Sequence, residues 1–191
     1  RPKQRALAAY YYNLFESEAK SQFAHLRESV IYNDANDYNV LTNQGQVNGL
    51  IDFGDLVYSH SINDLAITIA YAAMDKDDPL ATAIQITKGF NKVFPLQEAE
   101  LRALFPLICI RLLVSVTVAA INRRDHPDNA YLFVSEKPAW QLLEQFRQVA
   151  PAFAHYAFRQ ISGWEPCPQR KRYDDWLGSA KASLHPLVKF E

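Results

Sequence analysis

The sequence has little of what marks several large classes of protein. Its 191 residues include two cysteines, Cys109 and Cys167, in neither a Cys-x-x-Cys pair nor a zinc-binding spacing. Cys109 lies in an apolar run and is expected to be a buried thiol, so we expect a reducing, cytoplasmic compartment. The formal net charge of −1 gives no electrostatic footprint for nucleic acid, so no nucleic-acid partner is expected.

The N-terminal sequence RPKQRALAAYYYNLFESEAK contains no apolar segment of the kind that a signal peptide requires. It also lacks an initial Met, from which we expect a fragment, a processed chain or a domain of something longer. The longest apolar stretch, residues 103–121, approaches the length of a membrane span. Pro106 and Arg111 interrupt it, and a central arginine is costly in lipid, so we expect a buried helix and no membrane partner.

Apolar periodicity indicates a mainly helical chain. Apolar residues make up 49% and charged residues 21%, which is typical of one globular domain with a sizeable core. Steps of three and four residues between apolar positions predict helices over residues 4–28, 62–74, 80–93, 97–104, 107–123, 139–149 and 151–161. After Gly163 the composition shifts to prolines and a basic run, so residues 164–191 are interpreted as a tail or linker, with a turn or two of helix over 173–183.

The stretch 30–55, VIYNDANDYNVLTNQGQVNGLIDFGD, departs from the helical pattern. Its short apolar runs are separated by a polar loop and by a turn rich in Asn, Gln and Gly, which predicts a β-hairpin followed by a loop over 53–61. Asp34 and Asn39 would lie at one mouth of the hairpin, and Asp52 would leave the second strand at the same end. Two carboxylates and an amide there suit Mg²⁺, with one acid left to act as a base.

The order of these motifs resembles the catalytic and metal-binding loops of protein-kinase-like phosphotransferases, in which an Asp precedes an Asn by five residues and Asp-Phe-Gly follows, as at Asp34, Asn39 and Asp52. The metal loop IDFGD and the later Asp64-Leu65-Ala66 are similar to the aminoglycoside phosphotransferase and choline kinase group. The sequence NDANDYNVL, with YSH and DLAI downstream, most resembles the hydroxylysine-kinase-like branch of this group. That branch includes phosphotransferase domains fused to class III aminotransferases.

The resemblance implies a role for each matched residue. Asp34 would act on the proton of an acceptor hydroxyl, while Asn39 and Asp52 would hold Mg²⁺ against the phosphates of ATP. The family loop usually carries His two residues before the catalytic Asp, and this chain has Tyr32 there. Tyr32 and Asp64 are interpreted as braces of the loop, although Asp64 could equally be a helix-capping carboxylate.

Four more charged residues are candidates for acceptor binding: Asp37, Asp55, Arg123 and Arg124. The two acids extend the acidic site and would contact a substrate ammonium or a second metal through water, or serve only as turn carboxylates. The two arginines end a helix, where compensation of the helix dipole is the simpler reading. In related kinases the C-terminal helices build the acceptor site, which would let either arginine hold a substrate carboxylate.

Arg111 lies within an apolar helix and requires a partner, because an unpaired buried charge is very expensive. An acidic partner from the hairpin or from helix 62–74 would serve. A structural ion pair, or a side chain whose stem reaches the surface, is the simpler interpretation.

The resemblance covers residues 4–162 and lacks one half of a whole kinase. Only 33 residues precede Asp34, and no Gly-x-Gly-x-x-Gly phosphate loop occurs. We therefore expect a mainly α (α+β) fold: the helical C-lobe of a protein-kinase-like fold over residues 1–163, with a small β-hairpin at the catalytic loop. The N-terminal nucleotide lobe would lie upstream, outside this chain.

The expected function is that of a small-molecule kinase. The whole protein would transfer the γ-phosphoryl group of ATP to a hydroxyl of an amine-bearing metabolite, such as an amino alcohol, a hydroxy amino acid or an aminoglycoside. Its cofactors would be Mg²⁺ and ATP, and its partners would be the acceptor, the upstream lobe and, in some arrangements, a fused aminotransferase domain. The alternatives are a non-catalytic interaction or scaffold domain on the same fold and an unrelated Mg²⁺ phosphohydrolase.

These expectations yield a first prediction, that the isolated 191-residue chain does not turn over ATP. The lobe that covers the phosphates and supplies their lysine is missing from it. An assay with Mg·ATP and an amino-alcohol acceptor should show no phosphate transfer above background. Robust turnover would mean that the phosphate-covering lobe is not required.

Overall fold

A long helical run opens the fold in the computed structural model, which describes residues 2–184. The helix α1 spans Pro2–Leu14, and the run continues through one turn of π-helix (η1, Phe15–Ala19) and a 3-10 segment (η2, Lys20–His25). The helix expected over 4–28 therefore ends at His25, and Leu26 already has extended backbone angles. The chain leaves the helix early because the next residues are held by tertiary contacts described below.

Four short strands follow and form two antiparallel pairs. β2 (Val40–Asn43) and β3 (Gln46–Leu50) make the predicted hairpin, whereas β1 (Glu28–Ile31) pairs with β4 (Val57–His60). The loop expected over 53–61 was wrong at this point, because part of it is β4. The β1–β4 register pairs residues about thirty positions apart, and a pattern read along the chain does not reveal such pairing.

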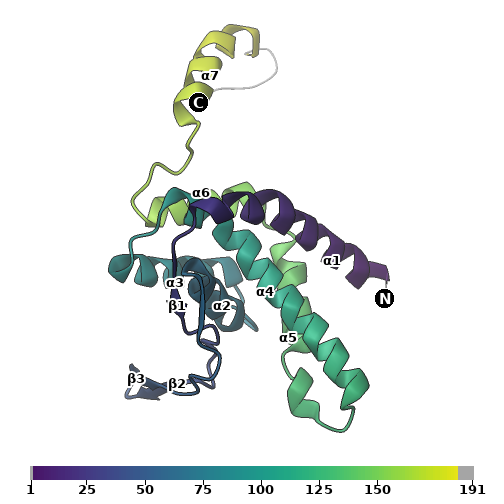
Figure 1. Cartoon of the computed structure of the whole chain (residues 1–191). Coiled ribbons are helices and arrows are strands. Elements are labelled where there is room, and N and C mark those ends of the chain that lie inside the picture. Colours follow the sequence, from purple (N-terminus) through teal and green to yellow (C-terminus); the bar gives the residue numbers. More distant parts are fainter. Residues whose placement is uncertain (1, 185–191) are drawn as a thin grey trace.

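Helices make up the rest of the described chain. Their bounds are α2 Ile62–Ala72, α3 Pro79–Val93, α4 Glu98–Asp125, the 3-10 turn η3 Ala130–Phe133, α5 Glu136–Phe146, α6 Pro151–Ile161 and α7 Arg170–Leu184. Figure 1 shows α4 running through the body of the molecule, with α2 and α3 on one side and α5 on the other. The β2–β3 hairpin projects from one end of the body and α7 projects from the opposite end.

The helix α4 is continuous where two helices were expected. The sequence predicted that Pro106 kinks or restarts the helix; Pro106 lies inside one continuous helix and is buried, so the restart was wrong. A proline removes one helical hydrogen bond, here the one to the carbonyl of Arg102, and Arg102 faces solvent. The buried residues on both sides of Pro106 keep the helix in place, because tertiary packing outweighs the local cost.

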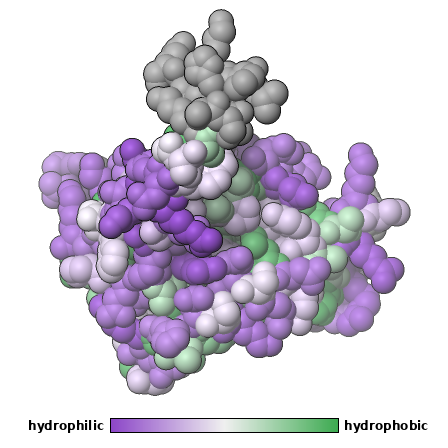
Figure 2. Space-filling model, turned by 90° about the horizontal axis from the view of Figure 1, so that it is seen from above, coloured by the Kyte–Doolittle hydropathy of each residue, from purple (hydrophilic) through white to green (hydrophobic). Residues whose placement is uncertain are grey.

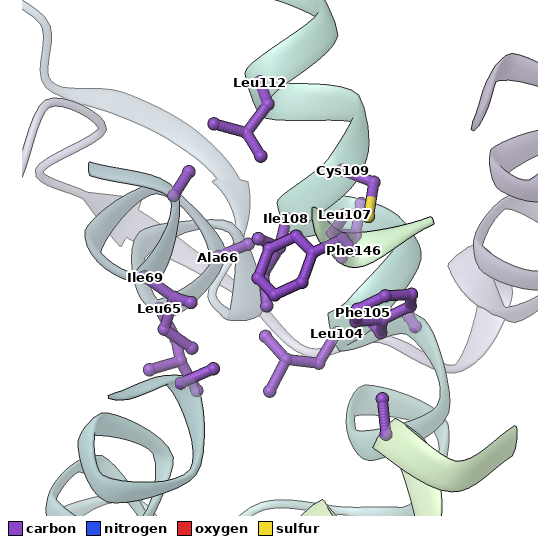
Figure 3. Packing of buried hydrophobic residues seen from close by; sticks show 14 of the residues in the cluster. Leu65, Ala66, Ile69, Leu104, Phe105, Leu107, Ile108, Cys109, Leu112 and Phe146 are labelled. Atoms are coloured by element: carbon purple, nitrogen blue, oxygen red, sulfur yellow. The ribbon is translucent and has the colours of Figure 1, made fainter. Parts of the chain in front are cut away.

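The hydrophobic core lies between α4 and the helices around it. In Figure 3, Leu65 and Ile69 of α2 face Ile108 of α4, and the Phe146 ring of α5 lies beside them. The rings of Phe105 and Phe146 meet edge to face, with centroids 5.3 Å apart. The site is therefore built on a packed helical base.

By length and composition, α4 is the one helix among the described residues that could cross a membrane. Half of its most apolar segment is buried inside the protein, as in the core helix of a globular fold. The face seen in Figure 2 is largely hydrophilic, with smaller apolar areas between polar ones.

A buried ion pair fixes the start of β1 to the start of α4. Arg27 donates from Nε to Oε1 of Glu100 at 2.8 Å and from Nη2 to Oε2 at 2.6 Å, and Glu100 is 0% exposed. Glu100 also accepts the backbone N–H of Gln97 at 2.8 Å, which completes a capping box. The Arg27 guanidinium lies over the ring of Phe94, 3.9 Å from its centroid. This cluster sets where β1, and hence the loop after it, leaves the body.

We predict that Glu100→Ala strongly destabilises the fold, because it leaves the Arg27 charge unpaired. The loss is about 1.5–3 kcal/mol, the worth of a hydrogen-bonded charged contact, because the Arg27 side chain is 34% exposed and water partly compensates its charge. Chemical denaturation would measure it. The matched control is Glu144→Ala on α5, where Glu144 is exposed and a change within about 0.5 kcal/mol is expected. Equal stability of the two variants would contradict the anchoring role of Glu100.

Candidate active site

The candidate site is a loop between β1 and β2, residues 32–39, which folds back on itself. The backbone N–H of Asn36 donates to the carbonyl of Asp34 at 2.8 Å, and that of Asn39 donates to the carbonyl of Asn36 at 3.2 Å. The Ile31 side chain before the loop is buried and anchors it to the core. The loop thus presents its polar side chains from a fixed base.

Asp34 and Asn39 meet within this loop. The Asn39 side-chain amide donates both of its N–H groups to Asp34, one to Oδ2 at 2.8 Å and one to the backbone carbonyl at 3.0 Å. The Asn36 amide donates to the same Oδ2 at 2.9 Å. Oδ2 of Asp34 is therefore held by two amides, and Oδ1 is the oxygen left for other chemistry. Asn39 is buried, and its carbonyl oxygen is the atom that a metal would use.

Asp52 follows the hairpin at the same end as Asn39, because the N–H of Ile51 donates to the Asn39 carbonyl at 3.0 Å. Its backbone is left-handed, with φ of 59°, and Asn33 beside Asp34 is also left-handed, with φ of 66°. Residues other than glycine rarely adopt this conformation, and such strain concentrates at functional sites. Asp52 is a residue that the sequence motifs single out, and Asn33 directly precedes another, Asp34.

Tyr32 connects the catalytic loop to the metal loop. Its hydroxyl donates to the carbonyl of Ile51, and its ring meets that of Phe53 edge to face at 5.4 Å. Burial is the main cause of the raised pKa of the Tyr32 hydroxyl, and the carboxylates of Asp34 and Asp52 raise this pKa further. The hydroxyl therefore stays protonated and remains a donor.

Asp64 in the first turn of α2 supports the loop from below. Its Oδ2 accepts the backbone N–H of Tyr32 at 3.0 Å, and its Oδ1 accepts that of Asn33 at 2.7 Å. One carboxylate thus satisfies two consecutive donors on the strained side of the catalytic loop. This arrangement is a brace, and Asp64 does not face the reacting groups.

Asp37 and Asp55 lie in different surroundings, although both are exposed. Asp55 is close enough to Tyr32 to add to the rise of its hydroxyl pKa, so Asp55 belongs to the acidic surroundings of the site. Asp37 occupies the turn before Asn39. Any role of either residue toward a substrate stays a prediction.

Arg111 enters the site from α4. Its Nη2 donates to the hydroxyl of Tyr71 at 2.9 Å and lies 3.8 Å from Oδ1 of Asp34. The acidic partner that the sequence required thus comes from the catalytic loop, and the Tyr71 hydroxyl of α2 accepts a hydrogen bond from the same nitrogen. Arg111 approaches the oxygen of Asp34 that the amides leave open.

Arg123 and Arg124 lie elsewhere. Arg123 is twelve residues beyond Arg111 on the same helix, about 18 Å at 1.5 Å per residue. It pairs with Glu136 and lies over the ring of Phe133, and Arg124 pairs with Asp125 at 2.7 Å. The structure does not bring these arginines together with Asp34, so their proposed contact with a substrate carboxylate finds no support in this geometry.

The donors present fit a magnesium ion whose shell is completed by other groups. Among the described residues, no group of three His, Cys, Asp or Glu side chains is placed to hold a metal. Mg²⁺ is usually held by one or two carboxylates together with substrate phosphates and waters. One carboxylate at Asp52 and one amide oxygen at Asn39 match that pattern, and they do not match a zinc site.

Sequence reasoning missed three contributors to the site. Asn36 holds Asp34, Asn33 takes up the backbone strain, and Tyr71 orients Arg111. Asn33 and Asn36 carried a signal, because asparagine tolerates left-handed backbone and binds locally in turns. Tyr71 carried no such signal, because nothing along the chain shows which aromatic hydroxyl contacts Arg111, 40 positions further along the sequence.

Comparison with known proteins agrees with this geometry. The chain matches the family described as "Phosphotransferase enzyme family" over residues 2–102, more than half of its length. It is 31% identical over 153 residues to "Hydroxylysine kinase" of Mus musculus and of Bos taurus, with 75% of this chain covered in each case. Against the Xenopus laevis protein of the same name, identity is 33% over 129 residues and 62% of this chain is covered. No solved structure gives a significant match.

The matched region is only part of each relative. It covers 41% of the mouse and bovine proteins and 34% of the frog protein, so the chain spans about two fifths of the length of the mammalian relatives. The family match contains the catalytic loop, the metal loop and the brace at Asp64. On the family match and on the identity and coverage of these relatives, the chain belongs to the phosphotransferase enzyme family, in its aminoglycoside phosphotransferase and choline kinase group.

Proposed function

We propose that this chain is the catalytic lobe of a kinase that transfers the γ-phosphoryl group of ATP to a hydroxyl of a small, amine-bearing metabolite. The observation that carries the proposal is the position of Asp34. One of its carboxylate oxygens is held by Asn36 and Asn39, and the other is left free by these amides and lies 3.8 Å from Nη2 of Arg111. Membership of the phosphotransferase enzyme family supports this reaction class.

Asp34 positions the acceptor hydroxyl and takes its proton. The hydroxyl oxygen forms a bond to the γ-phosphorus while the bond from that phosphorus to the leaving oxygen of ADP breaks. The proton passes to Oδ1 of Asp34, the oxygen that the two amides leave free. The hydrogen bonds that the two side-chain amides donate to Oδ2 hold the carboxylate in one orientation, so that Oδ1 stays directed at the acceptor.

Asn39 and Asp52 hold the metal, and Tyr32 fixes the metal loop relative to Asp34. Asn39 and Asp52 would hold Mg²⁺, which would supply positive charge against the phosphates of ATP. The Tyr32 hydroxyl donates to the carbonyl of Ile51, next to Asp52. In this way Tyr32 braces the catalytic loop against the metal loop. The Tyr at this position is therefore compatible with catalysis.

The domain organisation follows from the same proposal. Residues 1–163 belong to the C-terminal lobe, an upstream lobe binds the nucleotide, and residues 164–191 are the tail or linker, in which the structure describes the helix α7 over Arg170–Leu184, longer than the turn or two expected. The surface of the β2–β3 hairpin and of the loop after it favours the presence of an upstream lobe. This surface carries exposed large apolar side chains: Leu41, Val47, Leu50, Ile51, Phe53 and Leu56. Val47 is 68% exposed and Phe53 is 54% exposed, and a surface with so many apolar residues usually meets a partner.

The acceptor class is a hydroxyl compound with an amine, as in the hydroxylysine that names the relatives. Asp55 and Asp37 would contact its ammonium group from the exposed side of the site. A non-catalytic scaffold on the same fold is the rival proposal, and the two substitutions below separate it from catalysis.

The first test is Asp52→Asn in the whole protein, which removes an anionic ligand at constant size. Mg·ATP affinity should fall about tenfold or more, the effect of losing a contact of roughly 1.5–3 kcal/mol. Calorimetric titration measures the affinity, and the phosphorylation rate should fall with it. Asp77→Asn, in the exposed turn after α2, is the matched control and should change neither. Unchanged Mg·ATP affinity in Asp52→Asn would contradict the assignment of Asp52 as a metal ligand.

The second test is Asp34→Asn, which leaves both metal ligands in place. Turnover should drop by roughly two to four orders of magnitude, the range for general-base and positioning groups. Mg·ATP affinity should change little, because the role of Asp34 is realised at the transferring hydroxyl. An undiminished rate in this variant would contradict the assignment. A parent protein without activity, whose partner binding ignores both substitutions, would favour the scaffold.

A further inference from the structure

A cavity of about 420 Å³ opens beside the catalytic loop and is separate from the metal ligands. The π-helical and 3-10 part of the first helical run, the end of β4, the start of α2, the middle of α4 and Asn33 of the catalytic loop enclose it. The lining residues that matter here are Phe15, Phe23, Asn33, Asn63, Arg111 and Val114. Asn33 lies near the start of the catalytic loop and directly precedes Asp34, and Arg111 of the lining reaches to 3.8 Å from Oδ1 of Asp34.

Arg111 brings an incompletely paired charge to this cavity. Nη2 has the Tyr71 hydroxyl at 2.9 Å and the Asp34 carboxylate at 3.8 Å, but Nε is buried without a hydrogen-bond partner among the described residues. A buried donor without an acceptor costs free energy, and hydrogen bonds to charged groups are stronger than neutral ones. A guanidinium with free donors suits a planar, bidentate anion such as a carboxylate.

The position of Arg111 relative to Asp34 selects the source of that anion. Asn39, a proposed metal ligand, lies on the Oδ2 side of Asp34, and nucleotide phosphates would gather there. Arg111 lies on the Oδ1 side, where the acceptor hydroxyl must sit to lose its proton. An anion bound by Arg111 therefore belongs to the acceptor and not to ATP.

The other walls fit the carbon chain of such an acceptor. The rings of Phe15 and Phe23 meet edge to face, with centroids 5.8 Å apart, and form an apolar side of the cavity. Phe15 begins the single turn of π-helix, a local widening that recurs at functional sites in helices. That turn is located where the first helical run meets the cavity.

We propose that this cavity is the acceptor pocket and that Arg111 binds a carboxylate of the acceptor. The proposal rests on the proposed function, because it needs Asp34 to act on the acceptor hydroxyl. It narrows the substrate class to amino acids with a side-chain hydroxyl and disfavours amino alcohols and aminoglycosides, which lack a carboxylate. Arg111 acts as a specificity-determining residue, and Tyr71 orients it.

The test compares two acceptors that differ only in the carboxylate, hydroxylysine and the diamino alcohol obtained by decarboxylating it. In the whole protein, kcat/KM should be higher for hydroxylysine. Arg111→Gln should lower kcat/KM for hydroxylysine relative to the diamino alcohol by roughly 10- to 100-fold, the worth of one charged hydrogen-bonded contact. Arg102→Gln removes the same charge from α4, at an exposed pair with Glu18, and should leave the ratio unchanged.

A second variant guards against misfolding of Arg111→Gln. Tyr71→Phe removes only the hydroxyl that orients the guanidinium. It should lower kcat/KM for hydroxylysine several-fold more than kcat/KM for the diamino alcohol. An equal loss on both acceptors in Tyr71→Phe and Arg111→Gln would mean that Arg111 merely positions Asp34, and it would overturn the pocket. Weaker Mg·ATP binding with an unchanged acceptor ratio would assign Arg111 to the nucleotide phosphates and also overturn it.

Binding measurements separate failure of the pocket from failure of the proposed function. If the whole protein phosphorylates neither acceptor, calorimetry with the same two compounds still applies. Tighter binding of hydroxylysine that disappears in Arg111→Gln would keep the carboxylate pocket while the kinase proposal fails. Equal binding of the two compounds to the unmodified protein would overturn the pocket, whatever the activity.

Discussion

The candidate site depends on one carboxylate that does not react. Asp64 accepts the backbone N–H groups of Tyr32 and Asn33, and Asn33 is held in a left-handed conformation. A strained residue persists only where its surroundings over-determine it, and two hydrogen bonds to a charged acceptor do so here. Because Asn33 directly precedes Asp34, the brace sets the direction in which the catalytic carboxylate leaves the chain. Asp64 itself is rigid because it begins a helix packed on the core.

The helix α4 supplies both the packing and part of the chemistry. Its apolar residues form the centre of the core, and Arg111 on the same helix reaches the catalytic loop. Placing a guanidinium on a buried helix has a desolvation cost, which Tyr71 and Asp34 offset only in part. The buried Nε of Arg111 has no hydrogen-bond partner among the described residues, so part of this cost is not offset within the protein.

Much of this protein could be predicted from its sequence, and each success has a local cause. Helices such as Pro151–Ile161 follow from apolar residues at three- and four-residue steps. The hairpin follows from turn residues, and Gln44 and Gly45 adopt the positive φ that a tight hairpin turn needs. The family resemblance also rested on local spacing, five residues from Asp34 to Asn39. The failures were β4 and the continuity of α4 at Pro106, where long-range pairing and packing decide.

The sequence by itself therefore determined the types of most of its elements, with β4 the exception, together with the order of the motifs and the family. The tertiary structure alone decided which side chains meet. Arg111 needed a partner, but its contacts with Asp34 and Tyr71 join residues 77 and 40 positions away. The same holds for Arg123, which pairs with Glu136 and lies far from Asp34. Local patterns report interactions along the chain, whereas a site depends on distances across the fold, and packing of the helices around α4 sets those distances.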